Sequence, residues 1–508
     1  MLPVVTAAEM RALDRATIED VGLPALTLME TAGRATAAAA RALVRDARDR
    51  VAVVCGPGNN GGDGFVAARV LRAGGVDATV YLAVPRARVK GDAAAHLAIL
   101  ERSGGVVRMA DSPAALGEVA AEIAGAAVCV DALFGIGLER AVDGHLADVI
   151  AAIDRAAKKV ALDIPSGLET DTGRVLGVAV TADVTVAMAA HKVALASAPG
   201  FARCGRVEVA DIGVPPGVLA TQGVRAGLVE AADVAGWLPR TRALDHKGTR
   251  GHVVVIGGMP GMRGAGRLAA AAALRAGAGL VTLAAAGEPT ADDSIMTRAL
   301  DAHAELGELL ARKAAIAIGP GLGQSDAARR WVHEVLRAGV PAVIDADALN
   351  LIAAEIELLA RAAGPVVITP HPGEAARLLG AADASAVEAD RLAAARALAA
   401  KTRAVVVLKG ARTIVCDGAL GDDFCSINPT GGPALGTGGS GDVLSGVIAA
   451  LLAQQVSPYD AARAGVYVHG RAGDALAQIH GERGVVSSDL PVAVAGVLRE
   501  LEQIPRPA

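Results

Sequence analysis

The segment 436–446, "GTGGSGDVLSG", places one carboxylate, Asp442, after a run of small residues and at the start of an apolar helix. Glycines leave backbone amides free to face a phosphate, and the dipole of the helix favours an anion there. The carboxylate can accept a proton from an attacking hydroxyl while the amides stabilise the negative transition state. The pattern predicts phosphoryl-transfer chemistry, although a capped helix after a flexible loop would have the same sequence.

Polar residues at three strand ends of the first half suggest a second centre. The glycine-rich stretch 56–64, "GPGNNGGDG", could cradle an anion with its backbone amides. Asp131 and Asp163 follow two later strand-like runs, and parallel strands bring their carboxyl ends to one crevice. Loops carrying Asn60, Asp131, Asp163 and Ser166 could hold a hard cation there through oxygens while leaving one carboxylate for proton transfer. The alternatives are a tight turn at the glycines and a capping or loop-bonding role for Asp131.

Four further loops of the second half are expected at the same sheet edge as Asp442. They are "GPGLG" (319–323), "DADALN" (345–350), "TPHPGE" (369–374) and "KGART" (409–413). A lone histidine is usually structural. His371 stands between two prolines in one of these loops, so we predict a functional role for it.

These residues can meet only if the chain builds parallel sheets. The first half alternates short apolar runs with helical patterns, which predicts a mostly parallel sheet with helices on both faces. We expect a glycine loop followed by a helix from Phe65, and a later helix with Asp111 as its cap and Pro113 in its first turn. The expected strands are 51–56, 78–84, 127–135, 159–167, 182–190 and 206–213.

A second alternation begins after an interruption at 213–223, "GVPPGVLATQG". A chain of 508 residues is also too long for one ordinary core. We therefore predict two doubly wound, three-layer α/β domains, at 1–217 and 228–505. The strands expected in the second domain are 251–258, 279–286, 314–321, 341–348, 364–374, 404–410 and 412–418.

Composition and charge argue against several classes of partner. The net charge of −5 leaves no basic footprint for nucleic acid. No stretch reaches the ~20 consecutive apolar residues of a membrane span, and Glu9 and Asp14 interrupt the region where a signal peptide would be apolar. The five cysteines form no CxxC pair, which predicts buried reduced thiols at 55, 129, 204, 416 and 425. We expect a soluble cytoplasmic protein with no nucleic-acid or membrane partner.

Four motifs of the first half resemble the NAD(P)H-hydrate epimerase domain over residues 5–217: "LPALTLMETAGRA", "GPGNNGGDGFVAARVL", "DALFGIGL" and "DIPSGLETDTG". The resemblance implies a Rossmann-like fold with Asp163 as the catalytic residue. It implies a potassium ion on Asn60, Asp131 and Ser166. The hydrate contacts that it implies are Asn59, Asn60, Gly61, Gly62, Asp63, Gly135, Ile136, Gly137, Leu138, Glu139, Arg140, Ala141 and Asp163. One departure is Thr31, where that family usually has Asn.

The second half resembles the ribokinase-like superfamily and, within it, the ADP- or ATP-dependent NAD(P)H-hydrate dehydratases. The matching motifs span roughly 228–503 and include "HKGTRGHVVVIGG", "ITPHPGEAARLLG" and "GTGGSGDVLSGVIAALLAQ". The resemblance implies Asp442 as the catalytic residue and hydrate contacts at Ala265, Gly323, His371 and Asp442. It implies nucleotide contacts at Lys409, Gly410, Ala411, Arg412, Thr413 and Gly441. ADP is favoured over ATP as co-substrate, with Mg²⁺, and a homo-oligomer is expected.

Both resemblances suit one substrate, a hydrated NADH or NADPH with a hydroxyl on C6 beside the ring nitrogen. Loss of that hydroxyl gives a planar cation to which water can return on either face, and phosphorylation makes the hydroxyl a good leaving group. Two alternatives stay open. The second half could be a kinase of a vitamin or sugar alcohol, and the first half could be a binding domain like those of RNA-decapping scaffolds.

Overall fold

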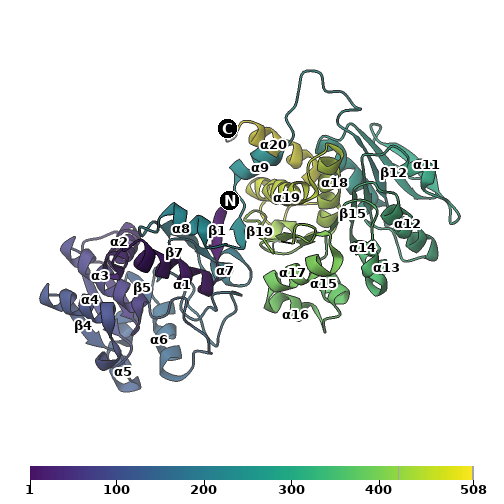
Figure 1. The fold of residues 1–508 in the computed structure, drawn as a ribbon. Coiled ribbons are helices and arrows are strands. Elements are labelled where there is room, and N and C mark those ends of the chain that lie inside the picture. Colours follow the sequence, from purple (N-terminus) through teal and green to yellow (C-terminus); the bar gives the residue numbers. More distant parts are fainter. Residues whose placement is uncertain (422, 506–508) are drawn as a thin grey trace. The chain divides into compact units, whose positions relative to one another are not determined.

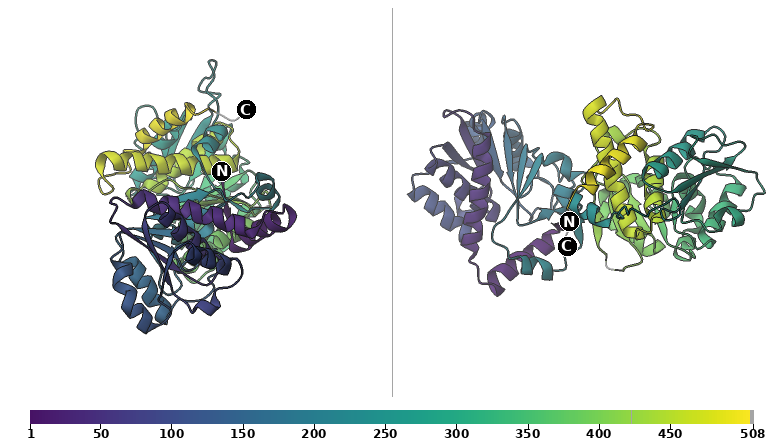
Figure 2. Two further views of the ribbon diagram at one scale, coloured as in Figure 1. Left: turned by 90° about the vertical axis from the view of Figure 1, so that its left-hand side faces the viewer. Right: turned by 90° about the horizontal axis from the view of Figure 1, so that it is seen from above.

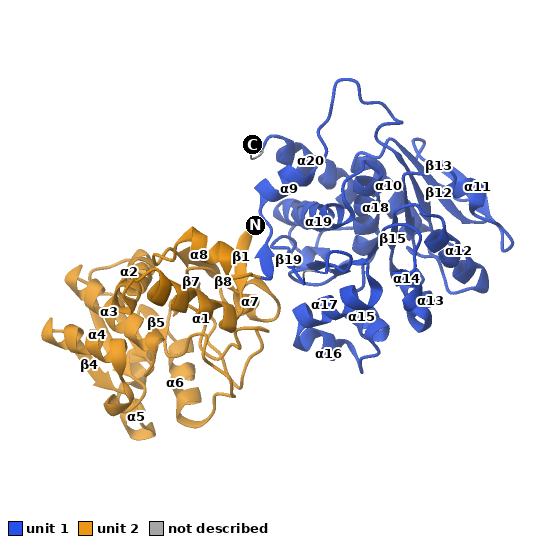
Figure 3. Cartoon of the chain, in the orientation of Figure 1, with its two compact units in different colours: residues 1, 225–508 blue, residues 2–224 orange. Residues whose placement is uncertain are grey.

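Two separate sheets organise the chain, for which the computed structural model describes residues 1–421 and 423–505. Leu2–Val224 form one unit, called here the N-terminal unit, and Arg225–Ala508 with Met1 form the C-terminal unit (Figure 3). Helices cover both faces of the sheet in each unit (Figure 1 and Figure 2). No helix of the described part is long and apolar enough to cross a membrane. Each unit is a three-layer, doubly wound α/β structure, as predicted.

The N-terminal sheet has the strand order β4-β3-β2-β5-β6-β7-β9, and every neighbouring pair is parallel. The chain order reverses at β2, whose neighbours are β3 and β5, so a crevice is expected outside the carboxyl ends of β2 and β5. This is a Rossmann-like arrangement. The strands are β2 (Arg50–Cys55), β3 (Asp77–Leu82), β4 (Val106–Met109), β5 (Val128–Ala132), β6 (Lys159–Leu162), β7 (Val184–Met188) and β9 (Arg206–Ala210).

Alternation along β2 explains the layers of this unit. Val51 and Val53 belong to a core with α2, α3 and α4, whereas Ala52 and Val54 belong to a core with α5 and α6 on the other face. Side chains of a strand point alternately to the two faces, so a continuous apolar run serves both cores. The helices are α1 (Ala7–Arg15), α2 (Ala25–Leu43), α3 (Asn59–Ala73), α4 (Gly91–Arg102), α5 (Pro113–Ala124), α6 (Gly144–Asp154), α7 (Val193–Ala196) and α8 (Pro216–Thr221).

The C-terminal sheet runs in the order β13-β12-β11-β14-β15-β16-β17-β18-β19-β10. It is parallel from β13 to β17, and β18 lies antiparallel to both β17 and β19. The strands are β10 (Ala226–Leu228), β11 (His252–Ile256), β12 (Leu280–Ala286), β13 (Met296–Leu300), β14 (Ala315–Ile318), β15 (Ala342–Ile344), β16 (Val366–Ile368), β17 (Val405–Leu408), β18 (Ile414–Asp417) and β19 (Cys425–Ile427).

A large core of the C-terminal unit lies between this sheet and four helices, α9, α10, α18 and α19, with α20 packed beside them. Helix α18 contributes almost all of its apolar residues to that core, which fixes the position of its N-terminus. The helices are α9 (Ala231–Trp237), α10 (Arg263–Arg275), α11 (Gly307–Leu310), α12 (Asp326–Arg337), α13 (Ala346–Ile352), α14 (Glu357–Ala360), α15 (Pro372–Leu379), α16 (Ala384–Ala389), α17 (Arg391–Thr402), α18 (Ser440–Ala453), α19 (Pro458–His480) and α20 (Leu490–Glu502).

Several local predictions differ from the structure. The cap of α5 is Ser112, whose side chain accepts a hydrogen bond from the Ala115 amide, rather than Asp111. Six strands of the described residues were not expected. Two of them, β4 and β13, have mostly exposed or partly exposed residues, and the others are β10, β19, β1 (Leu2–Val5) and β8 (His191–Lys192). Strands β1 and β8 pair in parallel and bring Lys192 opposite Val5.

The prediction that all five cysteines are reduced thiols is wrong for two of them. Cys416 and Cys425 face each other on the antiparallel strands β18 and β19 and form a disulfide. Adjacent strands bring paired residues close enough for this bond, with a Cα–Cα distance of 4.5 Å. Cys55, Cys129 and Cys204 are free and buried, as predicted.

Candidate active sites

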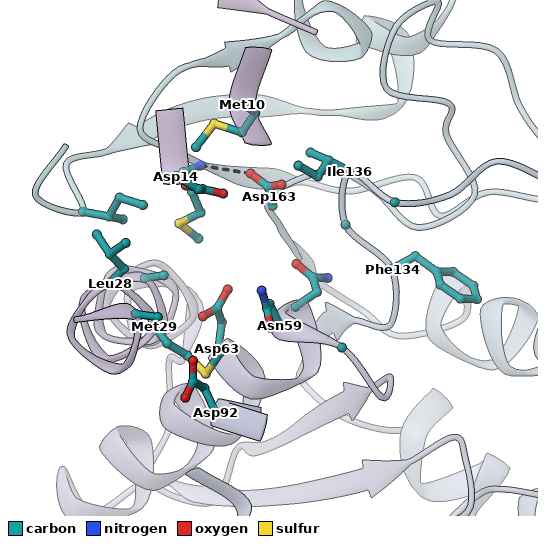
Figure 4. Close-up of a pocket in the computed structure, with 18 of the residues that line it drawn as sticks. Met10, Asp14, Leu28, Met29, Asn59, Asp63, Asp92, Phe134, Ile136 and Asp163 are labelled. Carbon is teal, nitrogen blue, oxygen red and sulfur yellow. Dashed lines mark hydrogen bonds between the residues drawn. The ribbon is translucent and has the colours of Figure 1, made fainter. Parts of the chain in front are cut away.

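A cavity of about 450 Å³ opens at the carboxyl ends of β2 and β5 in the N-terminal unit (Figure 4). Residues of the predicted hydrate site line it from three segments, and they are Asn59, Asn60, Asp63, Gly135, Ile136, Gly137, Leu138 and Asp163. Asp14 of α1 and Lys192 of β8 also line it, and neither residue was predicted. The cavity lies where the order of the sheet reverses, which is the usual place for a ligand in this architecture.

Most of the glycine-rich stretch, residues 59–64, forms the start of α3 rather than a loop before it. The helix begins at Asn59, six residues earlier than expected. A Cβ on Gly61 would lie 2.1 Å from the carbonyl oxygen of Gly56, and one on Gly62 would lie 2.5 Å from the Met29 sulfur. These glycines therefore allow the first turns of α3 to pack closely against the end of β2 and against α2. The N-terminal amides of α3 then lie at the cavity.

Asp163 is held by a buried ion pair at the end of β6. Its carboxylate accepts hydrogen bonds from Lys192 Nζ at 2.5 Å and from the Met188 amide at 3.1 Å. The Lys192 side chain has no exposed surface, and its Nζ also donates to the Met188 carbonyl at 2.6 Å. The backbone at Asp163 is left-handed, with φ of 67°. The carboxylate is thus fixed in the cavity with an ammonium as its direct partner.

Two more carboxyl groups face this ion pair. Burial raises the pKa of Asp14 to about 6. The positive charge of Lys192 opposes this shift, and the negative charge of Asp163 adds to it. Burial and the nearby carboxylates of Asp163 and Asp14 raise the pKa of Asp63 well above its usual value. Three carboxyl groups therefore lie around one ammonium, and the surroundings of Asp63 favour its neutral form.

Two of the three residues predicted to bind a cation, Asp131 and Ser166, are hydrogen-bonded to each other, and the third, Asn60, lines the cavity. Ser166 Oγ donates to Asp131 Oδ1 at 2.6 Å, and the Ser166 amide donates to Asp131 Oδ2 at 2.8 Å. Asp131 is fully buried, and burial raises its pKa to about 6 despite the hydrogen bonds from Ser166. The Nδ2 atom of Asn60 is buried without a hydrogen-bond partner. A buried carboxylate among hydroxyl and carbonyl oxygens fits a hard cation and gives no soft ligand.

The remaining predicted hydrate contacts do not line the cavity. Glu139, Arg140 and Ala141 are exposed and lie beyond its lining. Gly61 and Gly62 act through packing, as described above. Thr31 is also outside the lining. Its hydroxyl donates a hydrogen bond to the Thr27 carbonyl within α2.

The second centre lies at the N-terminus of α18, where Asp442 is the third residue of the helix. Burial and the negative charge of Asp345 raise the pKa of Asp442 to about 6, against the lowering effect of Lys409. A Cβ on Gly441 would approach Lys409 Nζ to 3.5 Å, so the lysine lies beside the start of the helix. The arrangement combines a carboxylate that can accept a proton near neutral pH with free amides for an anion.

A buried network supports this centre from the neighbouring strand ends. Asp345 follows β15 and accepts hydrogen bonds from Lys409 Nζ at 2.8 Å and from Ser445 Oγ at 2.6 Å. Burial would raise the pKa of Asp345, but Lys409 and Ser445 hold it below its usual value. Burial lowers the pKa of Lys409, but the negative charges of Asp345 and Glu374 outweigh this effect and hold the pKa above its usual range. The network joins the ends of β15 and β17 to α18.

The predicted dehydratase residues surround the same edge of the sheet. His371 caps α15, and its Nδ1 accepts a hydrogen bond from the Gly373 amide at 3.0 Å, while more than half of the side chain stays exposed. The Gly323 amide donates to Asp347 Oδ2 at 2.8 Å. Ala265 lies in α10 close to the 319–323 loop, because a Cβ on Gly321 would come within 3.1 Å of its side chain.

The predicted nucleotide segment, Lys409–Thr413, forms the turn between β17 and β18. Lys409 points inward to Asp345 rather than outward, and Thr413 Oγ1 closes the turn by donating to the Gly410 carbonyl at 2.9 Å. Gly410 has φ of 130°, and a Cβ there would lie 2.6 Å from the guanidinium of buried Arg391. The segment is therefore braced from α17 by a residue that was not predicted.

Asp14, Lys192 and Arg391 were missed because each stands alone in the sequence, far from the motif that it supports. Asp345 belongs to the segment "DADALN", which was expected at this sheet edge, but no role was assigned to it. For Lys192, a single charge between apolar residues was the one hint.

Comparisons with known proteins identify the family. The family model described as YjeF-related protein N-terminus matches residues 25–194, and the one described as NAD(P)H-hydrate dehydratase matches residues 253–494. The bifunctional NAD(P)H-hydrate repair enzyme Nnr of Moorella thermoacetica is 43% identical, over 98% of this chain and 97% of that protein. The chain belongs to the family of bifunctional NAD(P)H-hydrate repair enzymes.

Other members of the repair-enzyme family are similar over their whole length as well. The enzyme of the same name from Coxiella burnetii is 40% identical, over 95% of this chain and 96% of that protein. A crystal structure titled ADP/ATP-dependent NAD(P)H-hydrate dehydratase from Bacillus subtilis, co-crystallized with ATP/Mg²⁺, is 30% identical and covers 54% of this chain and 98% of that chain, with a TM-score of 0.47. The repair-enzyme match includes both units, so both centres belong to one bifunctional chain.

Proposed function

We propose that the protein repairs hydrated NADH and NADPH in two steps: the N-terminal unit interconverts the R and S hydrates, and the C-terminal unit dehydrates the S hydrate with an adenine nucleotide. The observation that carries the proposal is similarity to named repair enzymes over 98% of the chain, with a buried carboxylate centre in each unit. The domain limits 1–217 and 228–505 remain part of this proposal.

In the epimerase site, Asp163 is the residue that moves a proton at the C6 hydroxyl. The ring nitrogen expels the hydroxyl as water, and a planar cation remains until water returns. Ile136 and Met10 give the cavity an apolar wall beside Asp163, and the amide end of α3 faces the phosphates of the dinucleotide (Figure 4). Fixing Asp163 by two hydrogen bonds keeps the carboxylate in position throughout the reaction.

Potassium would be held by Asn60, Asp131 and Ser166, whose oxygens fit a hard ion. The bound cation would supply positive charge beside the pocket and offset the buried charge of Asp131. The expected result of exhaustive exchange into a buffer free of alkali cations is loss of epimerisation with no loss of dehydration of pure S hydrate. Full epimerisation under those conditions would contradict the potassium site.

In the dehydratase site, Asp442 accepts the proton of the C6 hydroxyl while a phosphoryl group is transferred to its oxygen. The amides at the start of α18 and the ammonium of Lys409 stabilise the negative charge of the transferred group. The ring nitrogen then expels phosphate, and loss of a ring proton restores NAD(P)H. Hydrate contacts at Ala265, Gly323 and His371 border this centre.

For the nucleotide, we propose ADP rather than ATP, bound at Lys409–Thr413 and Gly441. Within the described residues, no group of three His, Cys, Asp or Glu side chains could hold a metal ion. Mg²⁺ would therefore be bound mainly by nucleotide phosphates, as is usual for this ion. A homo-oligomer and a cytoplasmic location stay predictions.

One experiment tests both activities. The protein is incubated with mixed R and S NADH hydrate and either ADP, ATP or no nucleotide, and recovery of dihydronicotinamide absorbance is followed. We expect complete recovery with the preferred nucleotide and none without it. Recovery of only the S fraction would show that the N-terminal unit is not an epimerase. Release of a phosphorylated small molecule without NADH would favour the kinase alternative.

A further inference from the structure

The cavity of the N-terminal unit has carboxyl groups on two opposite sides. Asp163 extends into it from one side, and Asp63 of α3 extends into it from the other, so that the space between them is open (Figure 4). Asp14 lies on the same side as Asp163 in this view. The segment that contains Asp63 was expected to contact the hydrate, but no role in proton transfer was assigned to it.

Inversion at C6 requires proton transfer on two faces of one ring. The hydroxyl leaves from one face and must be protonated there, whereas the incoming water attacks the opposite face and must lose a proton there. A single fixed carboxylate reaches only one of these faces. The two hydrogen bonds that hold Asp163 prevent it from serving both.

The two carboxyl groups have different surroundings. Lys192 and the Met188 amide donate hydrogen bonds to the carboxylate of Asp163 and hold it on its side of the cavity. Burial and two neighbouring carboxylates raise the pKa of Asp63 well above its usual value, and Lys192 offsets this only in part. The other charged groups that face Asp63 are Asp14 of α1 and Asp92 of α4, both acidic. A donor and an acceptor thus face each other across the cavity.

We propose that Asp63 is the second catalytic residue of the epimerase site, donating the proton to the hydroxyl that leaves one face of C6 while Asp163 accepts a proton from the water that adds to the other. The inference rests on the proposed epimerase function. In this step the C6–O bond breaks and its electron pair leaves with the oxygen, which takes the proton of Asp63 and departs as water.

The nitrogen lone pair completes the cation, and a second water then forms the new C6–O bond and gives its proton to Asp163. One proton has moved from Asp63 to Asp163, and exchange with solvent restores both groups. The opposite direction uses the same two residues with exchanged roles. Every exchange of the oxygen atom is therefore linked to inversion of C6.

Turnover in H₂¹⁸O tests this link on the unmodified protein. R hydrate is incubated with the enzyme and potassium, without nucleotide, and the initial rates of label entry into the S product and into recovered R hydrate are compared after subtraction of the non-enzymatic rates. We expect label in the product and none in the recovered substrate. Label entering both at equal rates would mean that oxygen leaves and returns on one face, which would overturn the proposal.

The substitution Asp63→Asn tests the donor directly. Asn has the shape of a neutral carboxyl group, so folding and hydrate binding should be preserved. We expect kcat for epimerisation to fall by ~10²-fold or more, with KM changed by less than about threefold and dehydration of pure S hydrate unchanged. In the parent enzyme, kcat should fall as pH rises through the pKa of Asp63, and the variant should lack this alkaline decline.

The matched control is Glu118→Gln, an exposed carboxylate of α5 outside the cavity, which should behave as the parent. Parent-like kcat in Asp63→Asn would overturn the proposal and leave the epimerase function intact. A rise in KM with unchanged kcat would show that Asp63 only binds the hydrate, and would also overturn it. Failure of the parent itself to epimerise would instead contradict the proposed function.

Discussion

The two units each contain a buried lysine–aspartate pair, but the pairs are placed differently relative to the proposed catalytic carboxylate. In the N-terminal unit, Lys192 pairs with Asp163, which is itself the proposed catalytic residue. In the C-terminal unit, Lys409 pairs with Asp345, and the proposed base Asp442 stands next to that pair without belonging to it. The same two side-chain types thus support two different kinds of site.

The difference matches what each reaction requires. A carboxylate that exchanges a proton with water on one face of the ring benefits from the fixed position that a partner charge gives it. A base that accepts a proton from a hydroxyl near neutral pH benefits from a raised pKa, and Asp442 gains one from burial and from Asp345. A lysine can therefore support a catalytic aspartate in two ways, by pairing with it directly or by pairing with a neighbouring aspartate.

The largest expected effect comes from replacing each of the two proposed catalytic aspartates separately. Asp442→Asn should reduce dehydration by about 10²–10⁴-fold and leave epimerisation unchanged, because the acid–base group is lost in one unit only. Asp163→Asn should do the opposite. Rates with pure R and pure S hydrate distinguish the two activities, and R hydrate should accumulate in the mixed assay only with Asp163→Asn. A loss of both activities in either variant would contradict the separation of the sites.

Removing the lysines should destabilise the unit that contains them. Lys192→Met and Lys409→Met each leave a buried carboxylate without its partner, which costs about 3–5 kcal/mol of unfolding free energy. In thermal unfolding, Lys192→Met should therefore lower the unfolding temperature of the N-terminal unit, and Lys409→Met that of the C-terminal unit. The control is Lys158→Met, whose pair with Asp183 is partly exposed and is worth about 0–1 kcal/mol. Equal losses in all three variants would remove the distinction between buried and surface pairs.

Stability should also depend on pH through Asp442, whose folded pKa of about 6 lies above its usual value of 3.8. The folded state binds the proton more tightly than the unfolded state, so the group disfavours folding progressively as pH rises from about 4 to about 6. Asp442→Asn should therefore stabilise the protein by about 1–3 kcal/mol at pH 7, and the gain should shrink as pH falls to 4. Unfolding measured at both values checks the sign; a gain that grows at low pH would contradict it.

The smallest effect is expected at Thr31, the position where the epimerase family usually has Asn. Its hydroxyl donates to the Thr27 carbonyl within α2, and the side chain does not line the cavity. Thr31→Asn should therefore change stability by less than about 0.5 kcal/mol and epimerisation by less than about twofold. A larger change in KM for the hydrate would place this helix face in the binding site.

Sequence reasoning predicted the features that depend on local pattern. Apolar runs of four or more residues located β2, β5, β11 and β14, because buried parallel strands are continuous in hydrophobicity. The pattern failed at the start of α3, where glycines that looked like a loop serve close helix packing. It failed again at β18 and β19, because the pairing of Cys416 with Cys425 depends on strand register.

The candidate site was predictable in its carboxylates but not in their partners. Asp163 and Asp442 stand in recognisable motifs at element ends, whereas Lys192 and Lys409 are 29 and 64 residues away from the aspartates that they pair with. A lysine in an apolar strand does not indicate which charge it will meet. The order β15-β16-β17 brings Asp345 and Lys409 together, whereas Lys192 stands on β8, which pairs with β1 and not with a strand of the seven-stranded sheet.

The left-handed backbone at Asp163 has an evolutionary consequence. With φ of 67°, the position suits glycine and asparagine better than other residues, and aspartate tolerates it at a modest cost. The Asn variant is therefore a clean test of the carboxylate, whereas Ala would add backbone strain to any chemical effect. Glycine or asparagine would relieve the backbone but leave the buried ammonium of Lys192 without its charged partner, so relatives that keep this lysine are expected to keep an aspartate here.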